Sequence, residues 1–222
     1  MVDLADDDAL LAQLRARDAR AFEAMVDAWS GGMTRVARNF VSTHDSAIDV
    51  VQEAWLAVIH GLDRFEGRSS LKTWVFRILI NTAKKRGVSE HRTLPLSSLA
   101  DGDLGPTVDP ARFRGVDDPY PHHWWEMPVA WPSPEQAVLA DEFRSRVAAA
   151  VAELPARQAV VITLRDIEGY DAGEVCDLLG VTAANQRVLL HRARAFVRCR
   201  LEEYVTTVAV REAAPGEEAV TM

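Results

Sequence analysis

Cysteine is scarce in this chain, with Cys176 and Cys199 alone among 222 residues. The two lie far apart and form no Cys-x-x-Cys pair, so they give neither a disulfide framework nor a zinc site, and they suit a reducing compartment. Apolar runs are short as well, and none approaches the roughly 18 residues that a membrane span requires. The acidic first residues lack the basic and apolar stretches of a secretory signal. We therefore expect a soluble, cytoplasmic protein with no membrane insertion.

Catalytic and metal-binding motifs are also missing. The sequence contains no glycine-rich phosphate loop, no nucleophile elbow and no carboxylate pair in a pocket pattern. His122 and His123 are adjacent, so they cannot face one metal as residues four apart on a helix do, and no companion completes a ligand set. We expect a protein that is not an enzyme and that uses no metal and no cofactor.

Acidic residues outnumber basic ones, and the net charge of −8 argues against a protein that coats DNA through bulk electrostatics. The charge is unevenly distributed, however. No acidic residue interrupts the basic stretches from Arg68 to Arg86 and from Arg187 to Arg200. A solvated helix face is the ordinary interpretation of one such cluster. Two of them on an acidic chain, each inside a motif described below, favour local contact with nucleic acid.

Helical periodicity dominates the chain, and strand alternation is hard to find. Apolar residues recur three and four positions apart, which predicts one buried face per helix. We expect helices at about residues 6–16, 19–41, 45–62 and 69–87, then at about 134–152, 155–168, 171–179 and 182–204. The predicted fold class is all-α, with helical domains at 1–90 and 135–205, a linker at 91–134 and a polar tail at 206–222. Asp45 and either Ser69 or Ser70 are the expected N-caps.

The linker between the two predicted domains is rich in proline, since eight of the ten prolines fall between Gly87 and Pro134. It also holds Trp124, Trp125 and Trp131, an aromatic density that an inert spacer does not need. The segment either docks on a partner or on the protein's own domains, or it is a disordered tether. Both interpretations stay open.

Residues 171–188 have the pattern of a helix-turn-helix: a short helix, Gly180 at its end, and a threonine cap that opens a longer helix. Val188 and Leu189 are expected to help pack the two helices. Amide and guanidinium groups at the start of the second helix are the types that bind base edges in the major groove, and arginines further along suit phosphates. Helical corners of this kind also occur in bundles that bind no DNA. The predicted duplex-reading residues are Thr182, Asn185, Gln186, Arg187, His191, Arg192 and Arg194.

Two further segments carry a resemblance to a known family: Asp49-Val-Val-Gln-Glu-Ala-Trp, and the run from Ser70 to Lys85 that includes Lys-Thr-Trp-Val-Phe-Arg. With Leu154-Pro155 and the run from Leu164 to Gly169, they resemble the extracytoplasmic-function group of the sigma-70 family of RNA polymerase sigma factors. The resemblance covers residues 7–90 (region two of the family) and 135–204 (region four). It implies an alternative sigma factor that binds core RNA polymerase, directs it to promoter DNA and helps to melt the minus-ten element.

The resemblance also implies roles for individual residues. Asp49, Gln52 and Glu53, which share one helix face by spacing, would dock on the clamp helices of the polymerase's largest subunit. The loop from Arg64 to Leu71 and the helix after it would hold the melted non-template strand, with basic residues interleaved with aromatic ones. The predicted minus-ten residues are Arg64, Phe65, Arg68, Ser69, Lys72, Trp74, Arg77, Asn81, Lys84 and Lys85. An anti-sigma factor is a further partner expected from the resemblance.

The recognition helix departs from the family. Members commonly carry Gly-Thr-Val followed by a basic residue, a serine and a second basic residue, where this chain reads Ala184-Asn185-Gln186-Arg187-Val188-Leu189. This departure predicts that the chain prefers a different minus-thirty-five sequence from most members of the family, because Asn185 and Gln186 add amide groups that can read bases. Two alternatives are weighed against the sigma factor: a free-standing helix-turn-helix regulator, and a protein that sequesters core polymerase.

Overall fold

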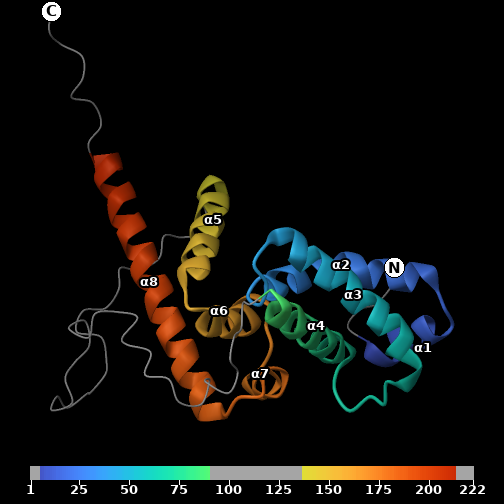
Figure 1. Ribbon diagram of the computed structural model, residues 1–222. Helices are drawn as coiled ribbons and strands as arrows, with labels where there is room; N and C mark the ends of the chain where they lie inside the picture. The colour runs from blue at the N-terminus through green and yellow to red at the C-terminus, as the bar shows by residue number, and fades with distance from the viewer. Residues whose placement is uncertain (1–5, 91–136, 214–222) are drawn as a thin grey trace, which may run out of the picture. The chain divides into compact units, whose positions relative to one another are not determined.

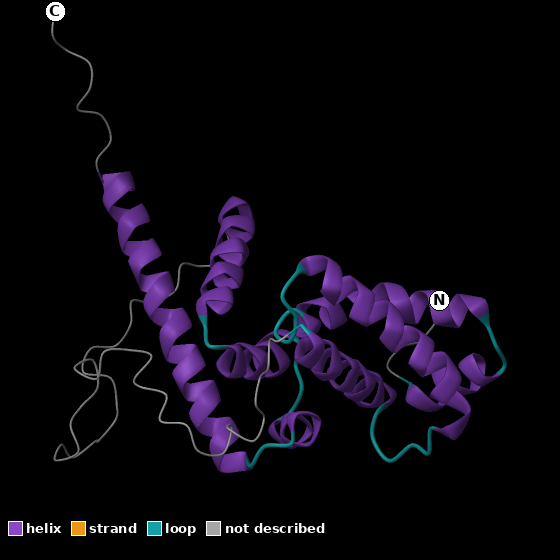
Figure 2. Cartoon of the chain, in the orientation of Figure 1, coloured by secondary structure: helices purple, strands orange, loops and turns teal. Residues whose placement is uncertain are grey.

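A computed structural model describes residues 6–90 and 137–213, and all regular structure in these two ranges is helical (Figures 1 and 2). The prediction of an all-α chain is confirmed. The predicted linker at 91–134, including its tryptophans and adjacent histidines, lies outside the described residues.

Four helices make up the N-terminal part: α1 (Asp7–Arg15), α2 (Ala19–Ala37), α3 (His44–Gly61) and α4 (Leu71–Ser89), with the short turn η1 (Leu62–Arg64) after α3. Each helix begins at a side-chain cap. Asp6, Asp18 and Ser70 cap α1, α2 and α4, so the expectation of a serine cap before α4 is confirmed. The cap of α3 is Thr43, whose hydroxyl accepts from the amide of Ser46. The prediction of Asp45 was wrong, because the cap lies two residues earlier and Asp45 is in the first turn of the helix.

The core of this part lies where α3 and α4 pack side by side with α2 across them (Figure 1). Its largest fully buried side chains include Leu10 of α1, Met25 and Met33 of α2, and Phe76 and Leu79 of α4. A polar link joins the end of α4 to the start of α3. The carboxylate of Glu90, just past α4, accepts from the amide and hydroxyl of Ser42, just before α3, at 2.9 and 2.5 Å. These two hydrogen bonds lower the pKa of Glu90 to about 2.

The remaining elements are α5 (Ala137–Glu153), α6 (Ala156–Ile162), η4 (Thr163–Ile167), α7 (Ala172–Leu179) and α8 (Ala183–Ala213). η4 is a π-helical turn, in which the amide of Glu168 donates to the carbonyl of Thr163, five residues back, at 2.9 Å. The long helix α8 continues to Ala213, beyond its predicted end at about 204 and into the predicted tail at 206–222.

The described residues form two compact units. The first unites α1–α4 with residues 160–187, and the second contains residues 137–159 and 188–213. The segment 160–187 therefore packs with the N-terminal helices, a grouping that the predicted boundary at 135 does not suggest. The domain boundaries themselves stay a prediction.

Candidate nucleic-acid and polymerase interfaces

One face of α3 is exposed along the whole helix. Its opposite face is buried through Ala47, Val50, Val51, Ala54, Trp55 and Val58, which turns Asp49, Gln52 and Glu53 outward together. Leu56 and Ile59 lie on the same exposed face, with 58 and 50% of their surface accessible. We call these five residues the α3 strip: Asp49, Gln52, Glu53, Leu56 and Ile59. Its two apolar members were not predicted from the sequence, although their spacing from Gln52 by four and seven positions places them on this face.

The acidic end of the α3 strip is tied to α4. The Arg86 guanidinium donates to a carboxylate oxygen of Glu53 at 2.5 Å, and both side chains are partly exposed. Such a pair contributes at most about 1 kcal/mol because water screens it. It fixes the position of a carboxylate that remains accessible.

The loop between α3 and α4 is held from α1. The Arg15 guanidinium donates to the carbonyl of Phe65 at 2.7 Å, and a carboxylate oxygen of Asp7 accepts from the amide of Leu71 at 2.7 Å. Phe65 is buried, with its ring centroid 5.1 Å from that of Trp74. The structure thus places Phe65, predicted as a minus-ten residue, beneath the surface as the support of Trp74.

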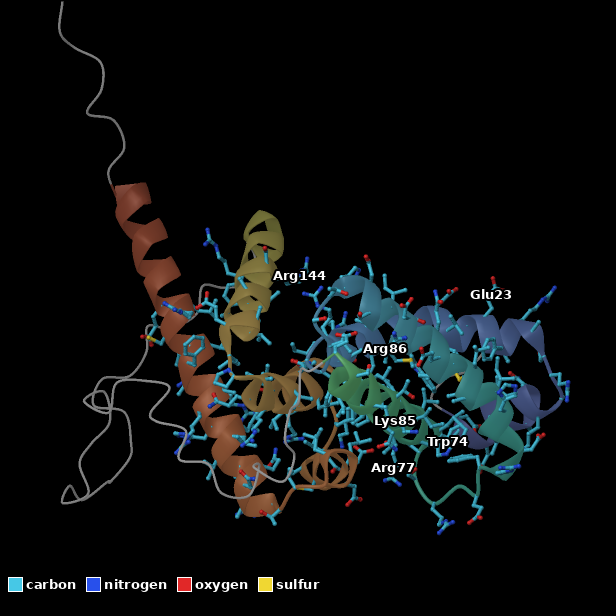
Figure 3. The ribbon with its side chains drawn as sticks, viewed as in Figure 1. Glu23, Trp74, Arg77, Lys85, Arg86 and Arg144 are labelled. Atoms are coloured by element: carbon cyan, nitrogen blue, oxygen red, sulfur yellow. The ribbon has the colours of Figure 1, made fainter. Side chains whose placement is uncertain are left out.

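The exposed face of α4 carries Trp74, Arg77, Asn81, Lys84 and Lys85, which we call the α4 basic strip. Arg77, Asn81 and Lys85 are exposed, and Trp74 and Lys84 are half-buried. Burial lowers the pKa of Lys84. Figure 3 shows Trp74, Arg77 and Lys85 spread along this helix. No acidic residue occurs from Leu71 to Ser89, so the α4 basic strip is a continuous cationic surface beside an indole.

Three of the remaining predicted minus-ten residues lie in the loop before α4: Arg64 and Arg68 are exposed and Ser69 is half-buried. Arg68 pairs with the neighbouring Glu66 at 2.6 Å. The last one, Lys72, lies on the other side of α4 from the α4 basic strip. Its ammonium donates to the carbonyl of Glu168 at 3.3 Å and lies 5.1 Å from the ring centroid of Tyr170.

The helix-turn-helix pattern is present in α7 and α8. Asp171 and Glu174 form a reciprocal capping box at the start of α7, and Gly180 ends the helix with a φ of 73°, a conformation that glycine adopts without strain. The hydroxyl of Thr182 accepts from the amide of Asn185 at 3.3 Å and so caps the start of α8.

The predicted duplex-reading residues divide between two faces of α8. Thr182, Arg187, His191 and Arg194 are exposed, and Asn185 and Arg192 are half-buried. Val188 is also exposed, at 49%, so its predicted packing role was wrong. We call the exposed set of α8 the recognition face: Ala184, Arg187, Val188, His191 and Arg194.

Gln186 does not belong to the recognition face. It is 1% exposed, and Leu189, Leu190 and Ala193, which follow at helical spacing, are buried on the same side of α8. Its amide nitrogen has no hydrogen-bond partner. In this structure the Gln186 side chain cannot reach a base edge, contrary to the expectation drawn from its residue type.

Neither a metal cluster nor a membrane-spanning helix occurs in the described part of the chain. Among the side chains that the structure describes, in residues 6–90 and 143–202, no group of three or more histidine, cysteine, aspartate or glutamate residues is placed to bind a metal ion. In the described segments, no helix is both long enough and apolar enough to cross a membrane.

Comparison with known families gives two matches. Residues 25–93 match the family Sigma-70 region 2, and residues 144–197 match Sigma-70, region 4. The first match contains the α3 strip and the α4 basic strip, and the second contains the helix-turn-helix.

Curated relatives extend the similarity over most of the chain. The RNA polymerase sigma-H factor of Pseudomonas aeruginosa is 30% identical over 188 residues, which cover 85% of this chain and 90% of the relative. The ECF RNA polymerase sigma-E factor of Haemophilus influenzae is 25% identical over 202 residues, or 91% of this chain and 98% of the relative.

Two solved structures share the fold. CnrH in complex with the cytosolic domain of CnrY has a TM-score of 0.53 and 22% identity, and covers 89% of this chain and 97% of its own. The sigma factor RpoE of Bartonella quintana, in complex with the anti-sigma factor NepR, also has a TM-score of 0.53, with 20% identity and coverage of 83 and 98%. The family matches and the curated relatives identify the chain as an alternative sigma factor, which directs RNA polymerase to promoters and belongs to the extracytoplasmic-function group of the sigma-70 family.

Proposed function

We propose that three surfaces of this sigma factor have separate binding roles. The α3 strip binds core RNA polymerase, the α4 basic strip holds the melted non-template strand of the minus-ten element, and the recognition face of α8 reads the minus-thirty-five duplex. The observation that carries the proposal is the α4 basic strip. It presents exposed cations and an amide beside Trp74, without an acidic residue along the helix, on a chain whose net charge is −8.

The α3 strip has the composition of a protein-binding surface. Leu56 and Ile59 expose half or more of their surface on a helix whose other apolar positions are largely buried. Large apolar groups that stay exposed beside charged ones are typical of docking sites. Asp49 and Glu53 flank them with negative charge, which favours a basic partner surface and fixes the register of docking.

The α4 basic strip suits single-stranded DNA. Cationic side chains neutralise phosphates, and an indole supported from below by Phe65 offers a rigid surface on which a base can stack. Extruding a base from the duplex costs a few kcal/mol, which stacking and phosphate contacts can offset without a catalytic group. Asp7 and Arg15 keep the preceding loop in place, so the exposed Arg64 and Arg68 start from a fixed backbone.

The recognition face suits a duplex. Arg187 lies in the first turns of α8, where a bidentate contact with guanine is geometrically accessible, and Arg194 lies two turns further on, where it can reach a phosphate. Val188 adds an apolar group between them, and such a group contacts the methyl of thymine. Gln186 has no role in this proposal.

The partners follow from these surfaces. Core RNA polymerase and promoter DNA are required by the function, which takes place in the cytoplasm. An anti-sigma factor, such as the one bound to the Bartonella relative, would act by covering the α3 strip and so excluding core polymerase.

The proposal is tested by reconstitution. The full chain is mixed with core RNA polymerase, promoters are selected from a random pool of duplexes, and transcripts are counted from the selected sequence. We expect transcription that depends on both components. Binding to duplex DNA without core polymerase, together with no transcript, would contradict the proposal and favour a free-standing regulator.

A pair of variants tests the docking surface. Leu56→Ala should weaken binding to core polymerase about tenfold, because a buried leucine contributes roughly 1.5 kcal/mol more than alanine at an interface. Val88→Ala is the matched control, since Val88 is equally exposed, at 61%, but lies on α4. Affinity is measured by titrating fluorescent chain with core polymerase. An equal loss of affinity in both variants, or no loss in either, would contradict the assignment of the α3 strip to core polymerase.

A further inference from the structure

Arg86 differs from the basic residues of the α4 basic strip in the direction of its side chain. It follows Lys85 in the chain, which places it about 100° further around the helix axis. Its guanidinium reaches α3, where it donates to a carboxylate oxygen of Glu53 at 2.5 Å. The side chain of Arg86 is 32% exposed, whereas Arg77 and Lys85 are exposed on the α4 basic strip (Figure 3). Arg86 is therefore a cation of α4 that faces the α3 strip.

The backbone that carries Arg86 is fixed at the end of α4. Its carbonyl accepts from the amide of Glu90 at 3.0 Å and from the hydroxyl of Ser89 at 2.7 Å. The carboxylate of Glu90 in turn accepts from the hydroxyl and the amide of Ser42, just before α3. These two bonds, with a smaller contribution from the charge of Arg86, lower the pKa of Glu90 to about 2. The end of α4 is thus tied to the start of α3, and the guanidinium reaches Glu53 from a fixed backbone.

The carboxylate that Arg86 binds has a like-charged neighbour. Asp49 and Glu53 lie four residues apart on α3, and both are exposed on the same face of the helix. Two carboxylates at this spacing repel each other, which favours side-chain conformations that turn them apart. A guanidinium bound to one of them offsets the repulsion. Glu53 keeps 53% of its side chain exposed in this pair, so it can still accept a hydrogen bond from a partner's cation.

From these contacts we infer that Arg86 is a positioning residue for the binding of core polymerase. It holds the Glu53 carboxylate beside Asp49, in the orientation that a basic surface of the polymerase binds, and does not touch the polymerase itself. Association costs the side-chain freedom that is lost at the interface, and a carboxylate already held by Arg86 loses less of it. The inference rests on the proposed docking role of the α3 strip and adds to it a residue from the neighbouring helix.

A double-mutant cycle on the full chain tests this role. Fluorescent Arg86→Gln, Glu53→Gln and the double variant are each titrated with core polymerase. We expect Arg86→Gln to weaken binding about threefold, which is within the range that an exposed ion pair contributes. Because Arg86 acts through Glu53, adding Arg86→Gln to Glu53→Gln should change the affinity by less than about 1.5-fold.

Arg38→Gln is the matched control. Arg38 is exposed at the end of α2, outside the three binding surfaces, so this variant should bind core polymerase like the unaltered chain. Circular dichroism shows whether each variant is folded. If Arg86→Gln is not folded, Arg86→Met takes its place, because it keeps an apolar stem, removes the charge and should give the same affinities.

Either of two results would overturn the inference. Unchanged or tighter binding by Arg86→Gln means that the guanidinium does not position Glu53 for the polymerase. An equal loss with and without the Glu53 carboxylate means that Arg86 contacts the polymerase directly. The docking role of the α3 strip is judged separately, by Leu56→Ala. If Leu56→Ala and Glu53→Gln weaken binding and Arg86→Gln does not, the positioning role alone is rejected.

Discussion

The buried amide of Gln186 gives a prediction whose size follows from the structure. The side chain is 1% exposed and its nitrogen has no hydrogen-bond partner. An unsatisfied buried polar group costs about 1–3 kcal/mol. Gln186→Leu keeps a similar volume and removes the polar atoms, so the free energy of unfolding should rise by about 1–3 kcal/mol, with about 2–4 °C in Tm for each kcal/mol in a chain of this size.

The assay is urea unfolding followed by circular dichroism, with Gln52→Leu as the matched control. Gln52 is exposed on α3, so the same substitution there should change the stability by no more than about 0.5 kcal/mol. Selection of bound duplexes from a random pool should return the same preferred sequence for Gln186→Leu as for the unaltered chain. Destabilisation, or a shifted base preference, would refute the reasoning, because either result means that the amide makes a contact that the buried position does not offer.

Three further predictions concern the other surfaces. Val188→Ser should lower the affinity for a selected thymine-containing minus-thirty-five duplex about fivefold, because roughly 1 kcal/mol of apolar contact is lost. A fluorescence titration measures this affinity, and an unchanged value would exclude the contact between Val188 and the thymine methyl. Asp7→Ala should destabilise the protein by about 1–2 kcal/mol in urea because it leaves the amide of Leu71 unpaired, whereas Asp8→Ala, exposed in the same helical turn, should have little effect. The pKa of Glu90 is lowered to about 2 in the folded chain, so its contribution to stability is present above pH 4.5 and is lost as the pH falls towards 2. Glu90→Gln should therefore flatten the dependence of the free energy of unfolding on pH between these two values. Identical pH dependences for the variant and the unaltered chain would contradict the link between Glu90 and Ser42.

The helices and the α4 basic strip could be predicted because their causes are local. Apolar spacing in α2 and α3, the Ser70 cap and the glycine at 180 each act within one or two turns of the chain. The absence of acidic residues from Leu71 to Ser89 is likewise visible in the sequence. What failed was the inference from residue type to exposure. Gln186 is polar and buried, whereas Leu56 and Val188 are apolar and exposed, because the packing of neighbouring helices decides which face of a helix is covered.

The contacts of Glu168 had no sequence signal for a different reason. The π-helical turn of η4 spaces the bonded residues by five, and one additional residue in a turn rotates every residue after it by about 100° around the helix axis. A prediction that assumes 3.6 residues per turn therefore places the side chain of Glu168 on the wrong side of the helix. Arg35, which donates to Glu168, and Gly32, which lies close to it, are both more than 130 residues away from Glu168 in the sequence. A methyl group at Gly32 would lie 2.3 Å from a carboxylate oxygen of Glu168, so alanine there would displace the end of that side chain from Arg35.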